Sequence, residues 1–214
     1  MFTPDDLHAT LAAAATGPAG GTVSLGDRRA TLRTGDHAAL LYWRHDELLE
    51  QIVPYLAAGL AAGDKVVYVA DDLTVDRIAA ALADAGVDFA GETARGNLVI
   101  ARSHDAFFGG GHFDVDRALA GVRGLADEAR AAGFTRVRFS VEMTYLLADV
   151  PGIERGREFE ARANSEIFAR YPFTCICSFN ADRATSNEVI ADVLATHPIV
   201  TSAGIPLVNP RYQG

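Results

Sequence analysis

Short apolar runs alternate with longer amphipathic stretches along most of the chain. Five runs predict β-strands because they are short and almost entirely apolar: HAALLYW, KVVYVA, NLVIAR, TRVRFSVEM and FTCICSF. The stretches that follow them predict helices over 46–62, 71–86, 114–132, 153–170 and 185–195, and a last extended pair, PIVTSAG and IPLVNP, closes the pattern. Strands that alternate with helices form βαβ units. We therefore expect an α/β fold with a mostly parallel central sheet and helices on both faces.

The first part of the chain does not share this rhythm. Residues 4–16 predict a short helix that begins after Thr3 and ends at the stretch GPAGG, and TVSLGDRRATLR predicts a hairpin around Gly26 and Asp27. We expect a helix and hairpin extension over residues 1–33 and one α/β domain over residues 34–214.

Composition and charge narrow the function classes. The chain has 214 residues, of which 49% are hydrophobic, and a formal net charge of -9. An acidic chain repels nucleic-acid phosphates and anionic lipids, so we expect no direct nucleic-acid binding and no membrane partner. No apolar run reaches the ~18 residues of a membrane span. The acidic N-terminus does not resemble a signal peptide, and two free cysteines indicate a reducing compartment, so a cytoplasmic location is expected.

The two cysteines, Cys175 and Cys177, lie two positions apart in one predicted strand. Their side chains point to the same face, and a disulfide between them would be strained. Buried structural thiols are the main interpretation and a thiol sensor is the alternative. Because no other cysteine or paired histidine lies at zinc-ligand spacing, no metal site and no cofactor are expected.

Side chains at the carboxyl ends of the predicted strands form the candidate site, because ligands of parallel α/β sheets bind beyond that edge. The set combines aromatic faces with a few polar heads, which is typical of a small-molecule pocket. The candidate ligand-binding residues are Trp43, Arg44, His45, Asp71, His104, Phe107, Glu142, Tyr145, Phe179 and Asn180.

Two motifs of common enzymes are missing from the sequence. The turn WRHDE after the first core strand contains neither the glycines nor the lysine of a phosphate loop. A serine-hydrolase elbow, G-x-S-x-G, is also missing, so no catalytic residue is assigned. The glycine cluster 109–111 lies in a loop over 103–113 that is either a lid over the strand ends or a plain loop.

Three single residues have open interpretations. Glu142 ends an apolar strand and either serves the pocket or has a structural role, in which it accepts a hydrogen bond or pairs with an arginine. His37 begins a strand and is expected to be a hydrogen-bonded core or edge residue. His197 is expected to mark a helix end, where a positive charge suits the dipole.

Several phrases, taken in order, resemble the MEDS family, the sensory domain of methanogen, methylotroph and dichloromethane-regulator proteins. They are GDHAALLYW, YLAAGLAAGDKVVYVADD, GNLVIARSHDAFFGGGHFD, AAGFTRVRFSVEMTYLL, EFEARAN, CICSFN and THPIV...NPRY, between about Gly35 and Tyr212. The resemblance implies a three-layer RecA/KaiC-like core without a phosphate loop. It also implies a sensory role that involves small organic, hydrocarbon-like ligands, often in proteins with a kinase or DNA-binding output domain.

Three functions follow from these observations. The favoured hypothesis is a non-enzymatic sensory or regulatory module that binds a small organic ligand at the carboxyl edge of the sheet. It would signal through a partner of the kinase or transcription-factor type, or through a homo-oligomer. One alternative is an enzyme on a degenerate nucleotide-type fold, with Glu142 and either His45 or His104 as the acid/base pair. The other is an interaction protein without a ligand.

Overall fold

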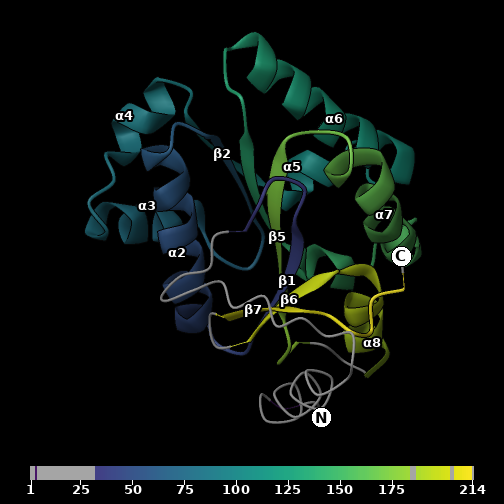
Figure 1. Ribbon diagram of the computed structural model, residues 1–214. Helices are drawn as coiled ribbons and strands as arrows, with labels where there is room; N and C mark the ends of the chain where they lie inside the picture. The colour runs from purple at the N-terminus through teal and green to yellow at the C-terminus, as the bar shows by residue number, and fades with distance from the viewer. Residues whose placement is uncertain (1–2, 4–31, 184–186, 203–204, 214) are drawn as a thin grey trace.

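Seven strands form one sheet in the order β3-β2-β4-β5-β1-β6-β7 (Figure 1). The computed structural model describes residues 3, 32–183, 187–202 and 205–213. The strands are β1 (His37–Tyr42), β2 (Lys65–Ala70), β3 (Leu98–Arg102), β4 (Val137–Glu142), β5 (Phe173–Asn180), β6 (Ile199–Ser202) and β7 (Ile205–Val208). Every neighbouring pair is parallel except β6 with β7, which is antiparallel. The mostly parallel sheet predicted from the sequence is confirmed.

Helices cover both faces of this sheet, so the fold has three layers (Figure 1). One face carries α2 (His45–Ala61), α3 (Val75–Asp84) and α4 (Phe89–Ala94). The other carries α5 (Ser103–Phe107), α6 (Val115–Ala131), α7 (Gly156–Ala163) and α8 (Asn187–Thr196). Short 3-10 turns, η1 (Met143–Leu147) and η2 (Ile153–Arg155), lie between β4 and α7, and a π-type turn, η3 (Asn164–Phe168), continues α7.

Strand periodicity decides which side chains meet which helices. In β1, Leu40 and Tyr42 pack toward α2 and α3, whereas Ala39 and Leu41 pack toward α6 and α7. The same alternation in β5 turns the odd-numbered residues from Cys175 to Phe179 toward α7 and α8. The side chains of a site under α7 therefore come from alternate strand positions.

The predicted elements agree with the structure except for short pieces. The predicted helix over 153–170 is a composite of η2, α7 and η3, and α4 and α5 were not predicted because five or six residues are too few to show a helical period. The predicted helix and hairpin within 1–33 lie outside the described residues except for 3, 32 and 33, and the boundary near residue 33 stays a prediction. Within the described part of the chain, no helix has the length and apolar character needed to cross a bilayer.

Candidate functional site

Glu47, in the first turn of α2, caps the turn that joins β1 to α2. Glu47 Oε2 accepts hydrogen bonds from the backbone N–H groups of Trp43, at 2.9 Å, and Arg44, at 3.3 Å. In a phosphate loop, backbone N–H groups in this position donate to the phosphate instead. Glu47 thus occupies donors that a polyphosphate would need and adds a negative charge beside them. This explains in physical terms why WRHDE suits a nucleotide poorly.

Glu142, the last residue of β4, is fully buried and accepts three hydrogen bonds. The Tyr68 hydroxyl donates to Oε1, and the backbone N–H groups of Asp72 and Leu73 donate to Oε2 at 2.5 and 2.8 Å. The expectation that Glu142 accepts a hydrogen bond is confirmed, and no arginine pairs with it among the described contacts. Burial raises the pKa of Glu142, although the hydrogen bonds from Tyr68 and from the backbone act in the opposite direction.

The raised pKa of Glu142 predicts a specific dependence of stability on pH. A group whose folded pKa lies above its unfolded value contributes stability that is fully present below the unfolded pKa and is lost as pH rises through the folded pKa. Glu142→Gln lacks this ionisation. We therefore expect wild type to gain unfolding free energy relative to Glu142→Gln as pH falls from neutrality toward about 4.3, the unfolded value. Urea unfolding of both proteins across that range measures the difference, and a constant or shrinking difference on acidification would contradict the raised pKa.

Asp72, which follows β2, joins two of the predicted site residues. Its carboxylate contacts His45 Nε2 at 2.6 Å and accepts hydrogen bonds from Asn180, at 3.0 Å, and Arg183, at 2.6 Å. Burial opposes the negative charge, but hydrogen bonds from His45 and Asn180, and then the charges of His45 and Arg183, lower the pKa of Asp72. His45 and Asn180 thus lie at one edge of the sheet, as predicted, and they are joined by Asp72, a strand-end residue that was not among the candidate ligand-binding residues.

Five other candidate ligand-binding residues lie either in the hydrophobic core or at the surface. Phe107 and Tyr145 are buried in the core, with ring centroids stacked at 4.6 Å. Trp43 is half-buried against the same core, whereas the side chains of Arg44 and His104 are exposed. For these five residues, contact with a ligand stays a prediction.

The loop over 103–113 is anchored at both ends. Ser103 donates a hydrogen bond to Asp71, the predicted site residue after β2, which ties the start of α5 to that strand. Phe108 and Phe113, on either side of the glycines 109–111, are 6% and 3% exposed. The residues on both sides of glycines 109–111 are thus tied to the core, and the role of the segment as a lid stays a prediction.

A cavity of about 160 Å³ opens between η1, α7, α8 and the end of β5. Its wall is mainly apolar and includes Met143, Leu146, Ile153, Phe179, Ile190 and Val193. Polar or charged residues also line it, at Thr144, Glu154, Arg157, Glu160, Asn180, Asp192 and Thr196. Phe179 and Asn180 were predicted site residues. The rest of the wall was not predicted, because only tertiary packing places α8 beside α7.

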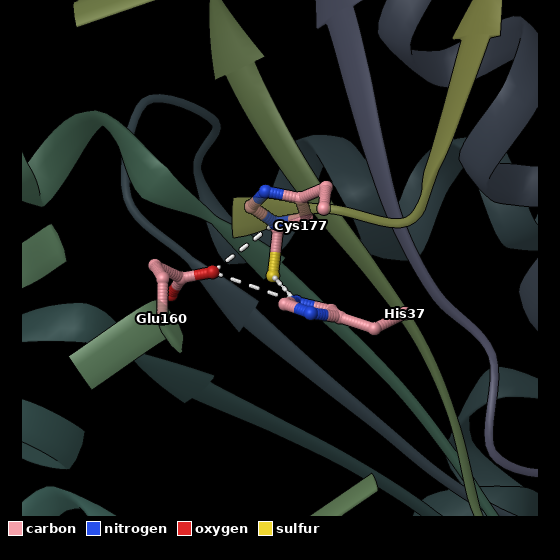
Figure 2. Close-up of side chains that lie close together, drawn as sticks. His37, Glu160 and Cys177 are labelled. Atoms are coloured by element: carbon pink, nitrogen blue, oxygen red, sulfur yellow. Dashed lines mark hydrogen bonds and ion pairs between the residues drawn. The ribbon is translucent and has the colours of Figure 1, made fainter. Parts of the chain in front are cut away.

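Glu160, on α7, connects this cavity with a buried group of titratable side chains (Figure 2). The His37 ring, on β1, faces both the Glu160 carboxylate and the Cys177 sulfur, on β5 (Figure 2), and His197 completes the group after the end of α8. All four residues are at most 4% exposed. Burial opposes the charge of Glu160, but the imidazoles of His197 and His37, at 3.1 and 3.4 Å from Oε2, hold its pKa at about 2. Burial likewise opposes the charge of His37, whereas Cys177 and Glu160 raise its pKa to about 10.

The topology and the first turn define the class of protein. The chain is a RecA/KaiC-like α/β domain in which the turn after the first strand is not a phosphate loop. Among solved structures it is similar to a KaiC-like protein from the hyperthermophilic archaeon Pyrococcus horikoshii OT3, with a TM-score of 0.54, 14% identity, and coverage of 80% of this chain and 72% of the other. It is also similar to an uncharacterized protein from Pyrococcus horikoshii in complex with an unknown peptide, with a TM-score of 0.60, 13% identity, and coverage of 80% and 78%. At these identities the likeness shows the fold alone.

The family is shown by the sequence itself. Residues 36–198 match the model of the MEthanogen/methylotroph, DcmR Sensory domain, and the chain belongs to this MEDS family. No curated protein matches the chain. The resemblance noted in the sequence is thereby confirmed, and the domain is one of a sensory family.

Proposed function

We propose that this domain is a non-enzymatic sensory module that binds a small organic molecule in the cavity between η1, α7 and α8. The cavity carries the proposal. Its volume of about 160 Å³ is close to that of the ~150 Å³ apolar cavity known to bind benzene in another protein. A mainly apolar wall with a few polar groups suits a compact organic molecule better than a nucleotide.

The polar groups at the carboxyl edge support binding without catalysis. Both oxygens of Glu142 are engaged by Tyr68 and by backbone N–H groups, so this carboxylate is held as a hydrogen-bond acceptor rather than kept free for proton transfer. Neither His45 nor His104 contacts it among the described interactions. The nearest carboxylate partners are Asp72 for His45 and Asp105 for His104.

Signalling would then depend on a partner. The cavity wall combines η1, η2, α7 and α8, so a ligand would touch elements from several parts of the chain and favour the arrangement that binds it. In the cytoplasm, a kinase or transcription-factor partner, or a second copy of the chain, would bind the ligand-bound arrangement in preference to the free one.

Ligand binding is tested by blocking the cavity. Leu146 is a half-buried part of the cavity wall, and Leu146→Trp would place an indole in the space for the ligand. A ligand at a hundred times its Kd adds ~2.7 kcal/mol of stability, which raises the Tm of a domain of this size by roughly 5–10 °C. In thermal-shift measurements with benzene, toluene and dichloromethane, we expect wild type to show such a rise with at least one compound and Leu146→Trp to show none.

Val208→Trp is the matched control, because Val208 lies on the edge strand β7, is 51% exposed and is not part of the cavity wall. It should keep the full thermal shift. Stabilisation by ATP with magnesium instead of the organic compounds would contradict the proposal and favour the enzyme alternative. Equal shifts in wild type and Leu146→Trp would place the ligand elsewhere.

A further inference from the structure

Four potential metal ligands converge beneath α7 from four separate parts of the chain. They are the imidazoles of His37 and His197, the thiol of Cys177 and the carboxylate of Glu160, and their ligand atoms all lie within 4.8 Å of one another. Nitrogen, sulfur and carboxylate oxygen together are the donor set that proteins use for zinc.

Hydrogen bonds at the far side of each ring fix both imidazoles for metal binding. His197 Nδ1 lies 2.9 Å from the Val193 carbonyl oxygen, which only accepts, so Nδ1 carries the proton. Asn164 donates its amide N–H to the Thr196 carbonyl oxygen at 2.8 Å, so its Oδ1 faces His37 Nδ1 at 3.0 Å as an acceptor. Both rings therefore turn Nε2 toward Glu160. A histidine that donates Nδ1–H to an oxygen and offers Nε2 is the usual arrangement of a metal ligand.

Three of the six distances between the ligand atoms are close to those around a tetrahedral ion, and the other three are at most 4.8 Å. His37 Nε2 lies 3.2 Å from Cys177 Sγ and 3.4 Å from Glu160 Oε2, and His197 Nε2 lies 3.1 Å from the same oxygen. Zinc bond lengths of about 2.0–2.3 Å at tetrahedral angles require ligand atoms about 3.3–3.6 Å apart. The three observed edges are thus within a few tenths of an ångström of the required separation.

Two buried polar atoms at the centre have no hydrogen bond. Glu160 Oε2 and His197 Nε2 are fully enclosed, and neither makes an aligned hydrogen bond among the described atoms despite their 3.1 Å separation. Orphaned buried polar atoms are rare and call for an unseen partner. A cation between them would satisfy both.

We propose that His37, Glu160, Cys177 and His197 bind one divalent zinc ion in a closed, tetrahedral site. A thiolate and a carboxylate together neutralise the two positive charges, so the buried site carries no net charge. Binding converts the Cys177 thiol to a thiolate and requires a neutral His37 with a free Nε2, so the thiol proton and the proton on His37 Nε2 both pass to solvent. Zinc would pin the start of β1 and the middle of β5 to α7 and to the residue after α8. The zinc site shares Glu160 with the wall of the cavity, but it does not rest on the organic ligand proposed above.

Cobalt(II) is the spectroscopic probe, because it binds to zinc sites and its absorption spectrum reports sulfur ligation and coordination number. The full chain is stripped with a chelator, shown by far-ultraviolet circular dichroism to be folded, and titrated with Co²⁺ alone. We expect one ion per chain, a thiolate-to-cobalt charge-transfer band, the intense visible bands of four-coordinate cobalt, and displacement by Zn²⁺. Elemental analysis of protein purified without chelator should show zinc in a one-to-one ratio.

Two cysteine variants make a matched pair. Cys175 is as buried as Cys177 and lies on the same face of β5, with its sulfur 3.8 Å away, but it is not one of the four ligands. Cys177→Ala should abolish the charge-transfer band and weaken Co²⁺ binding by roughly a hundredfold or more, since even the loss of an outer-shell partner costs 10–100-fold. Cys175→Ala should keep both the band and the affinity. Glu160→Gln, which keeps the shape of the side chain, should keep the band and lose affinity.

Several results would overturn the zinc site. Folded wild-type chain that binds neither Co²⁺ nor Zn²⁺ would show that the four groups form only a protonated ion-pair network. Equal loss in Cys175→Ala and Cys177→Ala, or cobalt bands without sulfur ligation, would also refute this ligand set. Thermal shifts with organic compounds are measured on the same stripped and loaded samples, so a failure of the zinc site is distinguished from a failure of ligand sensing.

Discussion

Glu142→Ala should destabilise the domain by about 3–5 kcal/mol, since each buried donor left without an acceptor costs about 1–3 kcal/mol. The substitution removes the acceptor of three donors at once, the Tyr68 hydroxyl and the backbone N–H groups of Asp72 and Leu73. Those two N–H groups belong to the turn between β2 and α3, so the turn should also lose its fixed shape. Equilibrium unfolding in urea near neutral pH measures the free energy directly.

Glu142→Gln is the matched control. Its remaining oxygen can still accept from the two backbone N–H groups, and its amide can donate to the Tyr68 oxygen, so we expect a loss of only about 1–2 kcal/mol. An alanine variant as stable as the glutamine variant would show that water replaces the carboxylate, and the structural role of Glu142 would then be wrong. Because Asp72 also holds His45, Asn180 and Arg183, the alanine variant tests whether the whole polar network depends on Glu142.

The strands were predictable because a buried strand appears in the sequence as a short run of apolar residues. KVVYVA is β2 without change of bounds, and FTCICSF is β5 extended by Asn180. Both of these strands lie between helices on the two faces of the sheet, so nearly every position is apolar and the run stands out. Composite elements leave no such record. The segment over 153–170 changes from 3-10 to α to π geometry, and hydrophobic spacing does not distinguish these forms.

The candidate site was predictable only as an edge of the sheet. Parallel strands bring their carboxyl ends together, so His45, Glu142 and Asn180 could be assigned to one edge from the sequence. The sequence did not show which of them remain free for a ligand. Phe107 and Tyr145 lie in the core, where their rings stack on each other. This contact joins α5 to η1 across 38 positions of the chain, so it could not be predicted from local spacing.

The buried cluster could not be found from spacing in the sequence. Zinc motifs are recognised from ligands a few residues apart, but these four potential ligands come from β1, α7, β5 and the residue after α8. His37 and Cys177 meet because β1 pairs with β5, with His37 opposite Cys175. His197 was correctly expected at a helix end, but burial and the charge of His37 lower its pKa, so the positive charge expected there is not favoured. Its partner Glu160 lies on a different helix. Only the fold brings the four residues together.

A substitution at Gly152, in the loop before α7, should cause the second largest loss of stability. Gly152 has a φ of +89°, and a Cβ added there would lie 2.1 Å from the Phe113 carbonyl oxygen. The left-handed conformation costs a non-glycine residue roughly 1–2 kcal/mol, and overpacking against backbone costs about 1–3 kcal/mol more. We therefore expect Gly152→Ala to lose about 3 kcal/mol and, for a domain of this size, roughly 10 °C in Tm, measured by urea and thermal unfolding.

Gly63→Ala separates the conformational cost of a positive φ from the steric cost of the added Cβ. Gly63, which follows α2, also has a positive φ, of +75°, but a Cβ there would meet no atom within 4 Å. It should lose only the conformational part, about 1 kcal/mol. Equal losses at both positions would mean that the Phe113 loop yields without cost. A larger loss at Gly152 would show that the loop after α5, which donates the Phe113 N–H to the Pro151 carbonyl oxygen at 2.9 Å, fixes the entry to α7. Since α7 carries Glu160, that contact would then also set the geometry of the cavity and of the zinc ligands.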